Sequence, residues 1–147
     1  MSLTLLGDIE EIMSKAKKTG PVINFDNIKI IDPVKSVYFD EFVNTYYALR
    51  KHKGVNLDTA RDIMTDVSYF GTMMVHKGIV DGMVSGAVNT TQHTIRPALQ
   101  FVKTKPGVSV VSSIFYMCMD SRVAIFGDCA INPDPTAEQL AEIAISS

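Results

Sequence analysis

The sequence predicts an α/β domain with a mostly parallel sheet. Short apolar stretches alternate with longer stretches of helical periodicity, and this β-α-β-α order is typical of helices layered on a sheet. The 147 residues are 46% hydrophobic and 20% charged, an ordinary composition for a globular protein. This length is enough for one domain or for a large part of a bigger one.

The first half of the chain has clear start and stop signals for its elements. Asp8 is a candidate helix cap, and Gly20-Pro21 is a helix stop. Met73, Met74 and Val75 are interpreted as core residues. The expected elements are a strand over residues 3–6, a helix from Asp8 to about Lys18, a strand over 28–31, a helix over 39–50, and shorter helices after Asn56 or Asp58 and over 68–77.

The second half is divided by a break at residues 104–107, the best candidate boundary between two lobes. Residues 1–107 are expected to form part of a first lobe and residues 108–147 the start of a second. The expected elements are a strand over 80–84, a helix carrying Pro97 to Lys103, a buried strand with its flank over 108–119, and a short antiparallel strand over 123–126. A last helix is expected to open at Asp134 or Thr136, with a capping box through Gln139 and an apolar face of Leu140, Ile143 and Ala144.

Charge and composition exclude several classes of protein. The net charge of −2 argues against a nucleic-acid binder, which needs a basic excess. No apolar run reaches bilayer length and no signal pattern opens the chain, so a cytoplasmic protein without a membrane partner is predicted. Cys118 and Cys129 are expected to be buried, reduced thiols, with a disulfide or a reactive thiol less favoured. The three histidines are too scattered to indicate a metal cluster.

The stretch from Val80 to Leu99 is typical of an anion-binding site. An apolar strand, a glycine-containing loop and the start of a helix would bring backbone N–H groups and the positive end of a helix dipole together. Gly82 and Gly86 allow unusual backbone conformations. Arg96 adds a charge whose planar fork suits phosphate. Further donors are Ser85, Asn89, Thr90 and Thr91. The alternative is an ordinary turn in which Thr94 caps the helix and Pro97 lies in its first turn.

A second basic segment, Arg50-Lys51-His52-Lys53-Gly54, ends the helix over residues 39–50. Cations in a last turn complement the helix dipole, and Gly54 is well placed for a C-cap. The functional alternative is a second phosphate contact.

Three segments together resemble the phosphate acetyltransferase family, with phosphate butyryltransferase as a sibling. They are D-G-M-V-S-G-A-V-N-T-T-Q-H-T-I-R-P-A-L-Q (81–100), G-D-C-A-I-N-P-D-P-T-A-E-Q-L-A-E-I-A (127–144) and Y-Y-A-L-R-K-H-K-G (46–54). The likeness runs at lower density from about Leu5 to the end of the chain. It implies a three-layer α/β/α fold like that of isocitrate and isopropylmalate dehydrogenases, with two lobes around a cleft and only part of each lobe in this chain.

The resemblance also implies an activity and a set of site residues. The activity is reversible acetyl transfer between acetyl-CoA and phosphate, by direct attack of the coenzyme A thiolate on acetyl phosphate in a ternary complex. It needs neither a metal nor a redox cofactor, and the family is usually dimeric. Arg96 is implied near the active site and the coenzyme A, and Arg50 at the 3′-phosphate of coenzyme A. The implied edges of the cleft are Ser85, Gly86, Thr90 and Thr91 on one side, and Asn132 and Asp134 on the other.

The chain departs from the family pattern at both ends. The serine–arginine loop credited with catalysis and the aspartate proposed as general base are expected downstream of residue 147, and the opening A-L-P-E-G strand is missing. The chain is therefore expected to be an inactive piece of a larger enzyme. The alternatives are a phosphate butyryltransferase and the acetyl-CoA-sensing regulatory domain of a malic enzyme.

Overall fold

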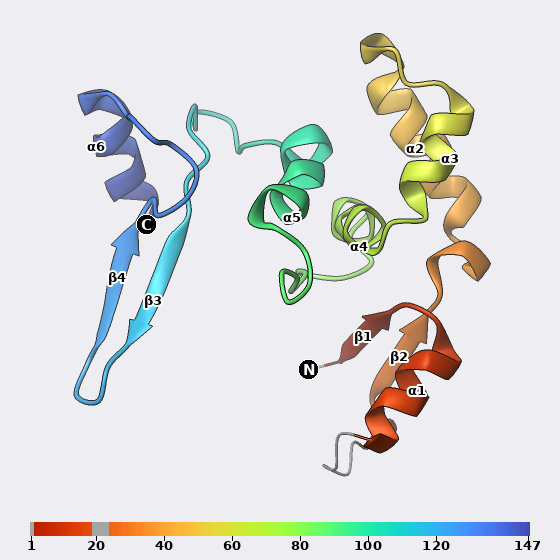
Figure 1. The fold of residues 1–147 in the computed structure, drawn as a ribbon. Coiled ribbons are helices and arrows are strands. Elements are labelled where there is room, and N and C mark those ends of the chain that lie inside the picture. The colour runs from red at the N-terminus through yellow and green to blue at the C-terminus, as the bar shows by residue number, and fades with distance from the viewer. Residues whose placement is uncertain (1, 19–23) are drawn as a thin grey trace. The chain divides into compact units, whose positions relative to one another are not determined.

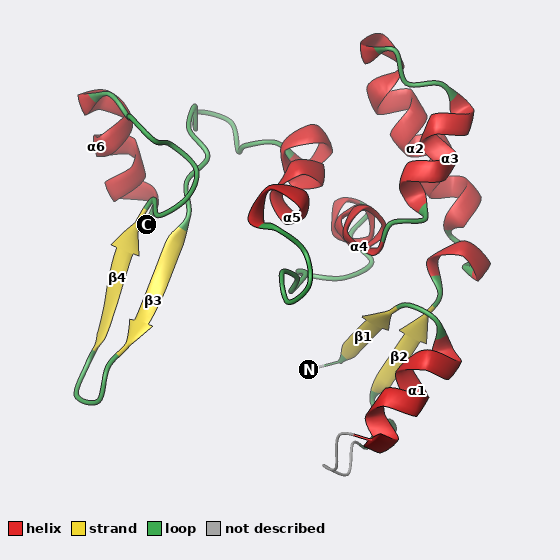
Figure 2. Cartoon of the chain, in the orientation of Figure 1, coloured by secondary structure: helices red, strands yellow, loops and turns green. Residues whose placement is uncertain are grey.

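The computed structural model describes residues 2–18 and 24–147, which form two compact units, 1–102 and 103–147. Helices and strands occur in both units (Figures 1 and 2). The predicted α/β class is confirmed.

The first unit opens with a β-α-β segment. Strands β1 (Leu3–Leu6) and β2 (Ile28–Ile31) pair in parallel, with Leu3 beside Ile28 and Leu6 beside Ile31. Helix α1 (Ile9–Lys18) lies between them in the sequence. The Asp8 carboxylate accepts a hydrogen bond from the Glu11 N–H at 3.0 Å, as a helix cap does. These three elements were predicted correctly.

The helical part of this unit begins with the 3-10 turn η1 (Pro33–Lys35) and helix α2 (Phe39–Arg50). The 3-10 turn η2 (Lys51–Lys53) follows, and Gly54 closes it at φ 81°. Helices α3 (Leu57–Met64) and α4 (Val67–His76) come next. Asn56 caps α3 and Asp66 caps α4, so both helices begin where a side chain accepts the first free N–H groups. The predicted helices are confirmed to within a residue or two.

The core of the first unit is aromatic and methionine-rich. The Phe42 and Phe70 rings lie 4.8 Å apart, and both side chains are fully buried. Met73 and Met74 are buried beside them, as predicted. Gly71 permits a close approach, because a Cβ there would lie 2.6 Å from the Met83 sulfur.

The predicted strand over residues 80–84 is wrong. These residues form an irregular loop, in which Val84 is fully exposed and Met83 packs toward Gly71. Each described sheet has only two strands, so nothing pairs with this segment. An apolar run becomes a strand only where a neighbour accepts its ladder of hydrogen bonds.

The helix after this loop starts earlier than expected. Helix α5 (Thr91–Pro97) is capped by Thr90, whose hydroxyl accepts from the His93 N–H at 3.2 Å. Thr94 is therefore not the cap, and Pro97 ends the helix instead of opening it. A proline has no N–H for the helix ladder, and the chain continues as the π-helical turn η3 (Ala98–Val102).

The second unit is a hairpin followed by a helix. Strands β3 (Ile114–Cys118) and β4 (Val123–Gly127) are antiparallel, as predicted, with Ile114 opposite Gly127. Within the range 108–119, predicted as a strand with its flank, the strand begins only at Ile114, because the Ser109 and Val110 N–H groups donate to the Glu142 carboxylate instead of to a strand. Helix α6 (Ala137–Ser146) opens with the predicted capping box of Thr136 and Gln139.

Burial in the second unit differs from the prediction. Cys118 and Cys129 are exposed free thiols, not buried ones. Of the apolar face predicted for α6, only Ile143 is buried, against Gly127, while Leu140 and Ala144 are exposed. A two-stranded hairpin with one helix at its end leaves both of its faces open over most of their length.

Candidate functional site

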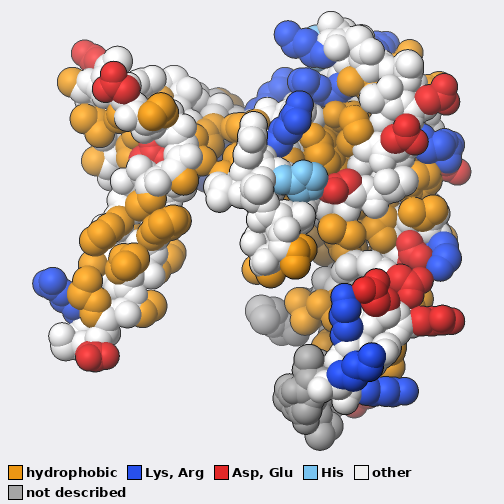
Figure 3. All heavy atoms as spheres, viewed as in Figure 1, with side chains coloured by type: hydrophobic (Ala, Val, Ile, Leu, Met, Phe, Trp, Pro, Cys, Tyr) orange, Lys and Arg blue, Asp and Glu red, His pale blue; other side chains and the backbone are white. Residues whose placement is uncertain are grey.

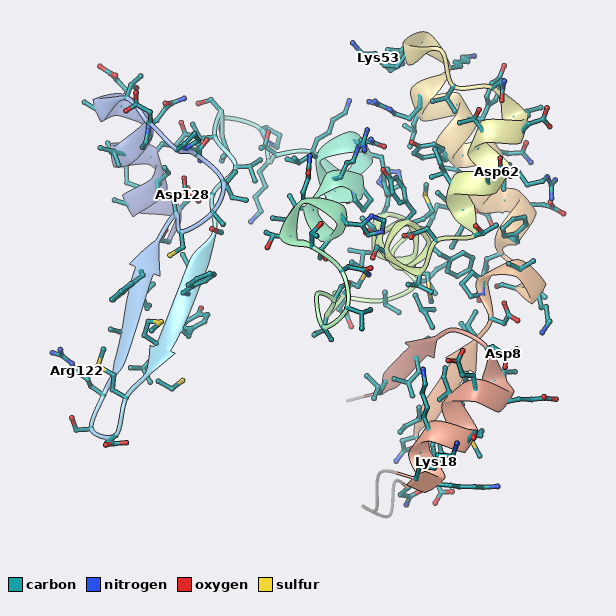
Figure 4. All side chains as sticks on the ribbon, in the orientation of Figure 1. Asp8, Lys18, Lys53, Asp62, Arg122 and Asp128 are labelled. Carbon is teal, nitrogen blue, oxygen red and sulfur yellow. The ribbon has the colours of Figure 1, made fainter. Side chains whose placement is uncertain are left out.

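Arg50 is the last residue of α2, and its side chain is half-buried. Its Nε is buried without a hydrogen-bond partner among the described residues. Burying an unpaired donor of a charged group costs free energy, so the Arg50 Nε–H is a candidate donor for a hydrogen-bond acceptor on a ligand. Lys51, His52 and Lys53 follow in η2, and Figure 4 labels Lys53 at the far end of that turn.

The guanidinium groups of Arg50 and Arg96 both influence the Tyr46 hydroxyl. The Tyr46 side chain is 2% exposed, and its hydroxyl donates to Gln100 Oε1 at 2.8 Å. Burial, with a smaller contribution from Tyr69, raises the pKa of this hydroxyl, and the guanidinium groups of Arg50 and Arg96 act in the opposite direction without reversing the shift. Both arginines therefore lie near one buried oxygen, although they come from different helices.

Arg96 is exposed in the last turn of α5. No carboxylate pairs with Arg96 or with Arg50 in residues 2–18 and 24–147. The expected placement at a helix N-terminus is wrong, because α5 starts at Thr91 and Arg96 lies at its carboxyl end. The local positive charge therefore comes from side chains and not from a helix dipole. Figure 3 shows Lys and Arg side chains gathered near the C-terminal end of α2.

The predicted loop donors are held by Ser68, a buried residue of α4. Its hydroxyl accepts from Asn89 Nδ2 at 3.2 Å and lies 3.5 Å from the Ser85 hydroxyl. Gly86 has a φ of 117°, as the loop prediction required, whereas Gly82 does not lie in the positive-φ region. Thr90 is occupied as a helix cap, and Thr91 is exposed at the start of α5.

Three residues that support this loop were missed by sequence reasoning. The His93 Nε2 lies 2.9 Å from Asp66 Oδ2, which joins the first turn of α5 to the cap of α4. Ser68 follows Asp66 and anchors the loop. The available signal was the Asp66-x-Ser68 cap pattern; nothing in the sequence pairs it with His93.

Asn132 belongs to the second unit, where it holds a turn. Its Nδ2 donates to the Val111 carbonyl at 2.8 Å and to Asp128 Oδ2 at 2.6 Å. Burial raises the pKa of Asp128, but hydrogen bonds from Asn132 and Ile131 outweigh it and leave the pKa below its usual value. Figure 4 labels Asp128 beside the end of β4. Asp134 lies exposed before the α6 cap. Nothing places either residue relative to the arginines.

Within the described residues, no group of three or more His, Cys, Asp or Glu side chains is arranged to hold a metal ion. No helix in the same part of the chain has the length and hydrophobicity to span a membrane.

The known proteins that this chain resembles carry the names phosphate acetyltransferase and phosphotransacetylase. The family described as "Phosphate acetyl/butaryl transferase" matches residues 1–147. The phosphate acetyltransferase of Synechocystis is 60% identical over 145 residues, covering 99% of this chain and 21% of that protein. The Corynebacterium glutamicum enzyme is 52% identical, covering 99% and 44%. The solved phosphotransacetylase EutD of Staphylococcus aureus is 44% identical, with a TM-score of 0.84 over 99% of this chain and 43% of that one.

The fold defines an α/β protein, and Arg50 and Arg96 give its first unit two basic side chains without a carboxylate partner among the described residues. The chain belongs to the phosphate acetyl/butaryl transferase family. It spans between 20% and 45% of the length of the curated relatives it matches.

Proposed function

We propose that this chain is the coenzyme A- and acyl phosphate-binding part of a phosphate acetyltransferase. The whole enzyme catalyses reversible transfer of an acetyl group between acetyl-CoA and phosphate. The observation that carries the proposal is the convergence of Arg50 and Arg96 on the Tyr46 hydroxyl, with no carboxylate to neutralise them in the described chain.

The chemistry explains why such a site needs cations. Acetyl phosphate and coenzyme A both carry negative phosphate groups, and attack of the thiolate on the acetyl carbon develops further charge on the carbonyl oxygen. Positioned cations and N–H donors lower the energy of that state and hold the two reactants together. The acetyl group moves from the phosphate oxygen to the sulfur, and inorganic phosphate leaves.

Each arginine has a separate role in the proposal. Arg50 binds the 3′-phosphate of coenzyme A through its free Nε and its outer nitrogens. Arg96, exposed in α5, binds the part of coenzyme A nearer the reacting thiol. A guanidinium binds phosphate through two parallel hydrogen bonds, which fixes direction as well as distance.

The loop after residue 80 adds to the proposed binding wall. Ser85, Gly86, Thr90 and Thr91 edge the cleft, and Ser68 fixes the loop through Ser85 and Asn89. Residues 1–107 supply this binding wall, and residues 108–147, with the Asn132 turn, begin a second lobe. The coenzyme A thiolate attacks the acetyl carbon itself, and the catalytic groups that assist it are proposed to lie outside residues 1–147. The enzyme is cytoplasmic and homo-oligomeric, and it uses no metal or redox cofactor.

The test combines binding with turnover. We expect coenzyme A to bind the 147-residue chain in a calorimetric titration, and we expect no release of thiol from acetyl-CoA when phosphate is added. A chain that does not bind coenzyme A would contradict the proposed site. Phosphate-dependent thiol release by the chain alone would show that the reacting groups lie within it.

A further inference from the structure

Tyr46 and Gln100 form a buried polar contact beside the two arginines. Tyr46 belongs to α2 and Gln100 to the π-helical turn η3, so their 2.8 Å hydrogen bond joins two separate elements. The Tyr46 ring is held edge-on by Tyr69 and Phe101, each with its centroid 5.9 Å away. Because the ring is fixed on both sides, its hydroxyl has one position.

The direction of this hydrogen bond leaves the phenol oxygen available as an acceptor. Gln100 offers its carbonyl oxygen, so the Tyr46 O–H is the donor and its lone pairs face the other neighbours. The Arg50 side chain is one of those neighbours, because it follows Tyr46 by four residues on α2 and so lies on the same face of that helix. The Arg50 guanidinium also opposes the rise in the pKa of this hydroxyl. Gln100 thus orients Tyr46, and Tyr46 in turn orients Arg50.

The π-helical turn explains how Gln100 reaches this place. The extra residue of a π turn rotates the following side chains relative to an α-helix, and such turns are frequent at functional sites. Here the turn follows Pro97 directly and also carries the buried Phe101. Gln100 therefore lies four residues after Arg96 on one continuous helical segment.

We propose that Tyr46 and Gln100 are positioning residues that hold the Arg50 guanidinium for the 3′-phosphate of coenzyme A. The inference rests on the proposed function and adds two residues to it. The single hydroxyl proton of Tyr46 is donated to Gln100 and is not offered to a phosphate, so the effect of Tyr46 on the ligand passes through Arg50.

The experiment is a calorimetric titration of the full 147-residue chain with coenzyme A and with 3′-dephospho-coenzyme A. The variants are Tyr46→Phe, which keeps the ring and removes the hydroxyl, and Gln100→Met, which keeps the length and removes the acceptor. We expect each to weaken coenzyme A binding about three- to tenfold, the effect of one lost hydrogen bond. Binding of the dephospho compound should change less than twofold, roughly the scatter of such comparisons.

The double variant and a matched control separate positioning from general damage. Tyr46→Phe with Gln100→Met should cost no more than either change alone, because both break one contact. Tyr38→Phe, on a ring stacked on Phe42, is the control and should leave both affinities unchanged.

The outcomes distinguish this inference from the proposed function. Equal weakening for both ligands in Tyr46→Phe and Gln100→Met would overturn the positioning role, as would unchanged binding in both. If Arg50→Ala and Arg96→Ala also bind as the unsubstituted chain does, the proposed site itself fails. If only the arginine variants lose binding, the site stands and the inference fails.

Discussion

Arg50 and Arg96 present two positive charges to one buried hydroxyl, and neither has an acidic partner in the described residues. Like charges near a buried oxygen repel each other, which disfavours the folded state unless an anion neutralises them. This arrangement is the basis of the proposed phosphate site.

Removing either guanidinium should weaken coenzyme A binding, but with different selectivity. For Arg96→Ala the loss of a charge-assisted contact costs about 1.5–3 kcal/mol, or roughly 10- to 150-fold in affinity. Arg50→Ala should lose the difference between coenzyme A and its 3′-dephospho form. The matched control is Arg61→Ala, since Arg61 is exposed and paired with Asp40 at 2.9 Å. Equal effects of all three variants would remove the two arginines from the site.

Tyr46 makes the fold sensitive to alkaline pH. Burial raises the pKa of its hydroxyl, so the folded state holds this proton more tightly than the unfolded chain does. The contribution to stability is complete below about pH 10, the unfolded value, and disappears as pH rises through the higher folded value.

Tyr46→Phe should therefore show a smaller fall in melting temperature than the unsubstituted chain between about pH 9 and about pH 11. Thermal unfolding followed by circular dichroism measures the difference. Parallel curves for the two proteins would show that Tyr46 ionisation does not contribute.

Helix starts could be predicted from residues next to the helix, whereas strands depend on a partner that is distant in the sequence. Asn56 and the Thr136–Gln139 capping box mark helix starts through residues next to the helix. The sequence indicated the capping box, and it left Asn56 or Asp58 as the start of α3. The strand predicted over residues 80–84 depends on a distant partner, and so does the point within residues 108–119 where β3 begins. Short-range patterns cannot show whether a partner strand is present, so the strand over 80–84 was predicted wrongly and the start of β3 stayed open.

The candidate site also has a part that the sequence predicted and a part that depends on the folded structure. The basic character of Arg50 and Arg96 was visible in the sequence, and the resemblance named the family correctly. The position of both arginines near the Tyr46 hydroxyl depends on the fold and on the π turn η3, which no local sequence pattern predicted. The predicted roles of Ser85, Gly86, Thr90, Thr91 and Asn132 remain predictions.

Glu142 fixes the segment before β3 to helix α6. Its carboxylate accepts from the Ser109 N–H at 2.5 Å, from the Ser109 hydroxyl at 2.7 Å and from the Val110 N–H at 3.3 Å. The Ser109 side chain and N–H are the main causes that lower the pKa of this carboxyl.

A lowered folded pKa means that this contribution to stability is complete above the unfolded value and is lost as pH falls through the folded one. Glu142→Gln should therefore destabilise the second unit at neutral pH and make its unfolding less sensitive to acid. Hydrogen exchange at the Ser109 and Val110 amides measures both effects. Equal protection of these amides in the variant would contradict the role given to Glu142.

At the scale of the whole molecule, the β3–β4 hairpin exposes apolar side chains on both faces. Tyr116 and Ile125 are opposite each other in the register, with 64% and 54% of their surface exposed. Exposed apolar area of this kind favours association, since burying it releases about 25 cal/mol per Å².

We expect the 147-residue chain to self-associate in sedimentation velocity experiments. The double substitution Tyr116→Ser with Ile125→Ser should shift it toward monomer. Val37→Ser is the control, because Val37 is 91% exposed but lies outside the hairpin. A monomeric unsubstituted chain at every concentration would contradict this expectation.

The central proposal is that the buried Nε–H of Arg50, which has no hydrogen-bond partner among the described residues, donates to a phosphate oxygen of coenzyme A. The direct measurement is the ¹H–¹⁵N NMR signal of that Nε–H group, assigned by its loss in Arg50→Lys. On saturation with coenzyme A, the signal should shift and its exchange with water should slow, whereas 3′-dephospho-coenzyme A should leave it unchanged. An Arg50 signal that is the same with and without bound coenzyme A would contradict the account.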